Sequence, residues 1–131
     1  MSTELTILAW TLVLAFVQIM LPAQLMTKEN GNKYNAGPRD TPPRESALSG
    51  RLRRAQANLF ETLPLFAAGL LIAHVANLEG ALTYWGAWLF LIGRIIYLPL
   101  YAYGIPYWRS AAWTVSLAGL VAIFVAILWP W

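Results

Sequence analysis

The 131-residue chain has no cysteine, one histidine and few charged side chains. The absence of cysteine excludes disulfide bonds, thiolate metal sites, iron–sulfur clusters and a cysteine nucleophile, and His74 alone cannot supply a multi-histidine metal site. Charged residues make up 11% of the chain and hydrophobic residues 59%, whereas an ordinary soluble domain carries about 25% charged residues. Intrinsic disorder is excluded as well, because it requires low hydrophobicity and high charge. The composition therefore predicts an integral membrane protein.

The few charges are unevenly distributed along the chain. Residues 27–54 contain seven of the nine Lys and Arg residues, and the remaining two are Arg94 and Arg109. A net charge of +3 can accompany nucleic-acid binding, but these basic residues stand beside long apolar segments. That placement is typical of a loop that flanks a membrane. We therefore expect lipid contacts and no nucleic-acid partner.

Four apolar segments are long enough to cross a membrane. A hydrocarbon layer about 30 Å thick needs roughly 20 apolar residues in a helix, and clusters of Gly, Pro and Asn separate the segments. Four helices joined by short connections form an antiparallel bundle. We predict one all-α transmembrane domain over residues 1–131, with spans at about 5–26, 55–75, 81–103 and 111–129 and a loop at 27–54.

The sequence also suggests where two helices begin. The second helix is expected to start before its span, between Pro43 and Arg51, and to project into water. Ser110 directly precedes the fourth span, and its hydroxyl group is expected to cap that helix.

The distribution of Lys and Arg predicts the orientation of the bundle. Loop 27–54 and Arg109 lie on one side, while both termini and the turn at 76–80 carry no basic residue. The positive-inside rule places the basic loops in the cytoplasm and both termini outside.

Polar side chains inside the apolar segments are the candidate functional residues. An ionisable group at the middle of a membrane costs about 2.5–3.5 kcal/mol and survives where it is paired or lines a cavity. With about 100° between successive helical residues, the polar positions of each segment fall on one narrow stripe. The second segment carries Arg51, Arg54, Asn58 and Glu61 on its stripe, and the third carries Arg94, Tyr97 and Tyr101.

Glu61 and Arg94 lie at similar depths below the cytoplasmic ends of their helices, given a rise of about 1.5 Å per residue. We therefore predict a buried ion pair between them. The alternative is that such a pair only fixes helix packing and takes no part in chemistry.

Two blocks of sequence form a recognisable combination. Residues 54–66 read RAQANLFETLPLF, and residues 93–110 contain GRIIY, a tyrosine at Tyr101, the turn GIP and the pair Arg109-Ser110. The two blocks resemble the MAPEG family, the membrane-associated proteins in eicosanoid and glutathione metabolism, whose pattern is close to R-A-x-x-N-x-x-E-x-x-P-x-F. The resemblance covers about residues 5–128. It is nearest to the bacterial branch of the family, which would place the protein in a bacterial inner membrane.

The resemblance implies a homotrimer that holds glutathione, without a metal, between neighbouring subunits on the cytoplasmic side. A bundle of four short helices has little internal room, which also favours a site between subunits. Arginines suit the two carboxylates of glutathione because they form bidentate pairs with them, and Glu61 suits its amino group. The implied glutathione-binding residues are Arg51, Arg54, Gln56, Asn58, Glu61, Tyr97 and Tyr101, with Gln56 off the main stripe.

Arg109 is the candidate catalytic residue, since it matches the arginine that faces the glutathione sulfur in active family members. A cation beside a thiol favours the thiolate, which is the nucleophile. Ser110 is a second candidate, through a hydrogen bond to the same sulfur. The structural alternative for Arg109 is a basic anchor at the membrane surface.

The resemblance therefore predicts a glutathione transferase or peroxidase that acts on a lipophilic electrophile or lipid hydroperoxide arriving from the bilayer. The alternative is a non-catalytic lipid-binding or scaffold protein of the same family. Thr62 and Ala57 stand where some eicosanoid-forming members carry Tyr and Arg, so an eicosanoid substrate is not indicated.

Overall fold

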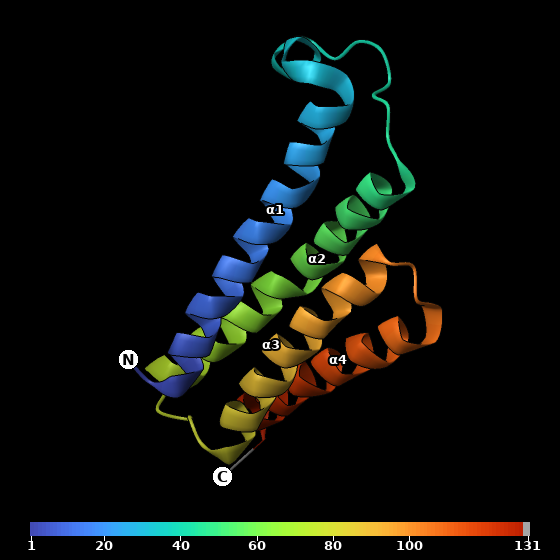
Figure 1. The fold of residues 1–131 in the computed structure, drawn as a ribbon. Helices are drawn as coiled ribbons and strands as arrows, with labels where there is room; N and C mark the ends of the chain where they lie inside the picture. The colour runs from blue at the N-terminus through green and yellow to red at the C-terminus, as the bar shows by residue number, and fades with distance from the viewer. Residues whose placement is uncertain (130–131) are drawn as a thin grey trace.

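Four long helices make up the computed structural model, which describes residues 1–129 (Figure 1). Within these residues there is no strand, and each helix is long and apolar enough to cross a membrane. The prediction of an all-α bundle with four spans is therefore confirmed. The helices are α1 (Thr3–Ala36), α2 (Ala47–Val75), α3 (Ala81–Ala102) and α4 (Pro106–Leu128).

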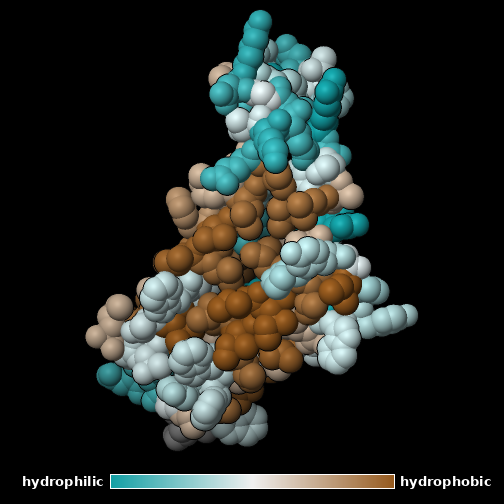
Figure 2. Space-filling view, viewed as in Figure 1, coloured by the Kyte–Doolittle hydropathy of each residue, from teal (hydrophilic) through white to brown (hydrophobic). Residues whose placement is uncertain are grey.

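The two ends of the bundle differ in character. We call the end that carries residues 37–46 the loop end, and the end that carries the α2–α3 turn at residues 76–80 the turn end. Hydrophilic residues gather at the loop end, and a belt of hydrophobic residues crosses the middle of the face seen in Figure 2. The belt has the form expected of a surface that lies in hydrocarbon.

The start of α2 agrees with the position predicted from the sequence, and the start of α4 does not. The α2 helix begins at Ala47, where the Ser46 hydroxyl accepts a hydrogen bond from Ser49 N at 3.1 Å. The α4 helix begins at Pro106, so the prediction that Ser110 caps it is wrong. Proline is favoured in the first helical position because its φ is already helical and it has no N–H to leave unpaired. Ser110 consequently lies one turn inside α4.

Residues 27–54 are less loop-like than the sequence indicates, because only 37–46 are outside helices. The α1 helix continues past a kink at Gly31, whose φ of 84° is accessible to glycine at little cost. Two side chains beside the kink hold the loop. The Asn30 amide exchanges hydrogen bonds with the backbone of Arg44 at 2.6 and 2.9 Å, and the Glu29 carboxylate accepts from Ser46 N and Oγ at 3.1 and 2.8 Å.

Hydrogen bonds at the turn end fix the N-terminus against the α2–α3 turn. Ser2 Oγ donates to Glu79 Oε2 and Thr83 Oγ1 donates to Glu4 Oε2, both at 2.8 Å. Glu4 is buried although it is a carboxylate. It lies in the first turn of α1, where the helix dipole favours negative charge. These contacts set the depth of α1 relative to α3.

The closest packing in the bundle is between α3 and α4, where two glycines face each other. A Cβ atom at Gly86 would lie 2.7 Å from the Gly119 carbonyl oxygen, and one at Gly119 would lie 2.8 Å from Phe90 N. Both contacts are with backbone, so no side-chain rotation can relieve them. Elsewhere the core is filled by large side chains such as the stacked rings of Phe66 and Phe90, whose centroids are 4.0 Å apart.

We expect Gly119→Ala to lower the free energy of unfolding by about 1–3 kcal/mol, because the added methyl group forces α3 and α4 apart. Gly80→Ala is the matched control, since a Cβ there meets no atom within 4 Å. Unfolding in micelles, followed by circular dichroism during titration with a denaturing detergent, compares the two. Equal stability of both variants would contradict the close approach.

Candidate functional site

A polar cavity of about 230 Å³ lies between α2, α3 and α4 in the half of the bundle nearer the loop end. Five of its lining residues are site residues predicted from the sequence. The sixth, Trp113, is not among the predicted site residues. It stands one turn after Arg109 on α4, a spacing that places both on one face of a helix. The lining residues are Asn58, Tyr97, Tyr101, Arg109, Ser110 and Trp113.

Arg109 lies in the first turn of α4, at the positive end of that helix dipole. Its guanidinium carbon is 4.7 Å from the centre of the Tyr101 ring, a cation–π contact that fixes the side chain. Gly104, with a φ of 70°, turns the chain between α3 and α4 and so brings Arg109 back over Tyr101. The arrangement concentrates positive potential at the cavity.

Ser110 contributes a hydroxyl group to the same cavity. Its Oγ donates to the Pro106 carbonyl oxygen at 3.4 Å, a long and weak hydrogen bond. Because this hydrogen bond is at the limit of bonding distance, the hydroxyl loses little when it turns toward a bound group. The cavity thus combines a fixed cation with a rotatable donor.

Asn58 connects the cavity to the interior of the bundle. Its Oδ1 accepts a hydrogen bond of 2.8 Å from Arg94 Nη1. Arg94 is fully buried, and its guanidinium carbon is 4.3 Å from the centre of the Tyr97 ring. Asn58 and Tyr97 form part of the cavity wall, so Arg94 contacts two wall residues from the interior of the bundle.

The predicted ion pair between Glu61 and Arg94 is not formed. In residues 1–129 the one ion pair that involves Arg or Lys is Arg53–Glu45 at 2.8 Å, and His74 Nδ1 lies 3.3 Å from Glu79 Oε1. Glu61 is exposed on α2, one turn beyond the asparagine that Arg94 contacts. Asn58 and Glu61 are about 60° apart around the helix axis, and the asparagine is the residue turned toward α3.

The remaining glutathione-binding candidates lie outside this cavity. Arg51 Nη1 donates to the Ala102 carbonyl oxygen at 3.3 Å, at the end of α3. Arg54 is exposed on α2, as is Glu61. Gln56 lines a different cavity of about 220 Å³ between α1, α2 and the loop, together with Arg39 and Arg53. One chain therefore brings together Asn58, Tyr97 and Tyr101 of the seven candidates, and leaves Arg51, Arg54, Gln56 and Glu61 outside.

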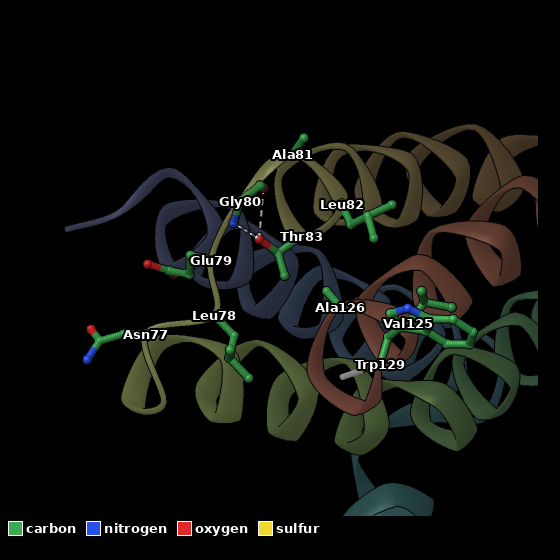
Figure 3. A pocket seen from close by; sticks show the side chains of 10 residues that line it. All are labelled: Asn77, Leu78, Glu79, Gly80, Ala81, Leu82, Thr83, Val125, Ala126 and Trp129. Carbon is green, nitrogen blue, oxygen red and sulfur yellow. Dashed lines mark hydrogen bonds between the residues drawn. The ribbon is translucent and has the colours of Figure 1, made fainter. Parts of the chain in front are cut away.

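A cavity of about 410 Å³ at the turn end has different chemistry (Figure 3). The Glu79 carboxylate points away from it in Figure 3 and accepts from Ser2. The Thr83 hydroxyl is engaged by Gly80 N at 2.8 Å. Asn77 and mostly apolar side chains, among them leucine, valine and tryptophan, form the rest of the lining. No basic residue lines it, so it lacks a group that would stabilise a thiolate.

Comparison with known proteins gives one match. The model of the MAPEG family matches residues 7–129, which include all residues of the polar cavity. No curated protein and no solved structure matches the chain. Among residues 1–129, no group of three or more His, Asp or Glu side chains is placed to hold a metal ion.

Proposed function

Because the chain belongs to the MAPEG family, we propose that it is a glutathione-dependent membrane transferase or peroxidase. The observation that supports this activity is the polar cavity, in which the helix fold gathers Arg109, Ser110 and two tyrosines around one small space. A thiol in that space would meet a cation and hydroxyl donors. Each of these favours the thiolate over the thiol.

The proposed chemistry begins with ionisation of the glutathione thiol beside Arg109, the proton leaving to solvent. In a transferase the thiolate sulfur forms a bond to an electrophilic carbon, and the leaving group departs with the electron pair of the broken bond. In a peroxidase the thiolate attacks the O–O bond, which releases an alcohol and leaves a sulfenic acid. A second glutathione then yields glutathione disulfide and water.

We propose further that a homotrimer completes the site. A cavity of about 230 Å³ is below the range of roughly 300–1,000 Å³ usual for ligand sites, and it is small for a tripeptide. Arg54 and Glu61 are exposed charges on the span α2, which is costly unless another subunit covers them. The Gln56 cavity, with its basic residues, offers a second wall for the carboxylates of glutathione.

The acceptor is proposed to be a lipophilic molecule that enters from the bilayer. A hydrophobic belt crosses the face seen in Figure 2, and α3 and α4, which line the polar cavity, carry exposed large hydrophobic side chains. The basic loop end would face the cytoplasm of a bacterial inner membrane, with both termini outside, so that glutathione reaches the cavity from the cytoplasm.

The test of this function is glutathione binding by purified protein, followed by ultraviolet absorbance of the thiolate. We expect the absorbance to rise to a plateau as glutathione is added at neutral pH. S-methylglutathione, which has no thiol proton, should give no rise when it is added in place of glutathione. Turnover with 1-chloro-2,4-dinitrobenzene is measured on the same samples. Absence of both signals would contradict the proposal and favour the non-catalytic lipid-binding alternative.

A further inference from the structure

Gln18 is a buried polar residue in the middle of α1 with no hydrogen-bond partner in residues 1–129. Its side chain is 1% exposed, and neither Nε2 nor Oε1 is bonded. It lies on the stripe of α1 that packs into the bundle, one turn from Ala15, which belongs to the apolar core. An amide in such a place costs about 1–3 kcal/mol if both ends remain unpaired. This cost points to a bonding partner that is not an atom of residues 1–129.

Arg94 also has unbonded buried atoms, and the groove between α1 and α3 indicates that it lies near the level of Gln18. The chain neighbours of the two residues, Val17 and Ile95, line one apolar groove of about 500 Å³ between α1 and α3. Gln18 and Arg94 are buried, whereas Val17 and Ile95 are exposed. The side chains of Gln18 and Arg94 therefore lie inside the bundle, next to the end of this groove. Arg94 Nε and Nη2 are buried and unbonded, since Asn58 takes up only Nη1.

The unpaired atoms define the kind of molecule that would satisfy them. Arg94 Nε and Nη2 are donors and need acceptors, while Gln18 needs an acceptor for Nε2 and a donor for Oε1. A halide ion accepts but cannot donate, so it would leave Gln18 Oε1 unpaired. Water both donates and accepts, and buried waters commonly join otherwise unsatisfied polar groups.

We propose that Gln18 and Arg94 form a buried water-binding site in the centre of the bundle. One or more waters accept from Arg94 Nε and Nη2 and donate to Gln18 Oε1. The site lies behind the polar cavity, because Arg94 also contacts Asn58 and Tyr97 of the cavity wall. Gln18 is thus a positioning residue: it acts on the cavity through water and Arg94 without touching the cavity itself.

The direct test is transfer of magnetisation from water to the protein in solid-state NMR of the full chain in lipid bilayers. We expect cross-peaks from water to Arg94 Nε and to the Gln18 side-chain amide at short mixing times. Gln18→Leu should remove the water cross-peak at Arg94 Nε. Thr11→Val is the control, because Thr11 is equally buried but its hydroxyl donates to the Ile7 carbonyl oxygen at 2.8 Å.

Stability and binding provide a second measurement. We expect Gln18→Leu to raise the unfolding equilibrium constant at least about tenfold, and to do so far less in an Arg94→Met background. Gln18→Glu, which keeps an acceptor for the water and adds a charge opposite to that of Arg94, should retain stability. An increase in stability of Gln18→Leu, or a direct Gln18–Arg94 hydrogen bond without a water signal, would overturn the proposal.

The positioning role rests on the proposed function, and its readout is the dissociation constant for glutathione. Gln18→Leu should weaken binding severalfold, Gln18→Glu should recover it, and Thr11→Val should leave it unchanged. Equal binding by Gln18→Leu and the natural chain would overturn the positioning role. No binding by any of these proteins would contradict the proposed function, while the water cross-peaks would still decide the water site.

Discussion

Arg109→Ala is expected to lower kcat/KM for conjugation of glutathione to 1-chloro-2,4-dinitrobenzene by about 100- to 1,000-fold. This is the usual loss when one fixed group that stabilises developing negative charge is removed from an active site. The side chain is held over Tyr101 at 4.7 Å in the first turn of α4. Its loss therefore removes the one cation among the residues that line the polar cavity.

The pH dependence separates loss of thiolate stabilisation from misfolding. A cation lowers the pKa of the bound thiol, so the natural protein should keep its rate down to lower pH than the variant. Without Arg109 the thiol returns toward the ordinary pKa of about 8.5, and the rate of Arg109→Ala should rise as the pH increases through that value. A variant that has unfolded would show no such recovery.

Two control variants accompany this measurement. Arg109→Lys keeps the charge but has no planar guanidinium to stack on Tyr101, so an intermediate rate is expected. Arg44→Ala removes an exposed basic side chain that lines none of the cavities near the loop end, and it should retain full activity. An Arg109→Ala rate close to that of Arg44→Ala would limit Arg109 to anchoring at the membrane surface.

The spans could be predicted from the sequence because hydropathy depends on composition alone. Residues 5–26 contain no charge, and in a membrane such a continuous apolar segment satisfies its backbone hydrogen bonds as a helix. The helix ends were harder to predict where two signals competed. Ser110 and Pro106 both mark helix starts, and the proline prevailed because the earlier start forms one more turn of hydrogen bonds.

Five of the six residues that line the polar cavity are candidates from the sequence, but their contacts could not be predicted. Spacing gives the angle of each side chain around its own helix, so the stripe on α2 could be identified. It does not give the rotation of α2 relative to α3, which determined that Asn58 and not Glu61 meets Arg94. The same limit explains Gln18, since its burial depends on how α1 is placed against α3.

The contact between Asn58 and Arg94 carries the largest expected effect on stability. Asn58→Leu removes the one acceptor that Arg94 has in residues 1–129 and leaves a buried guanidinium without a protein acceptor. We expect the free energy of unfolding to fall by about 2–4 kcal/mol, because a buried charge then loses its hydrogen bond. Titration of the purified protein with a denaturing detergent measures this loss.

Asn58→Asp is the informative companion, because aspartate keeps the acceptor at the same position and adds a charge opposite to that of Arg94. It should be at least as stable as the natural chain near neutral pH and should lose this stability as the pH falls and the carboxylate is protonated. Gln56→Leu makes a similar change on the same helix away from Arg94 and should alter stability by no more than about 0.5 kcal/mol. If Asn58→Leu and Gln56→Leu were equally stable, Arg94 would have to find its partner elsewhere, and Asn58 could not be the residue that joins the bundle interior to the polar cavity.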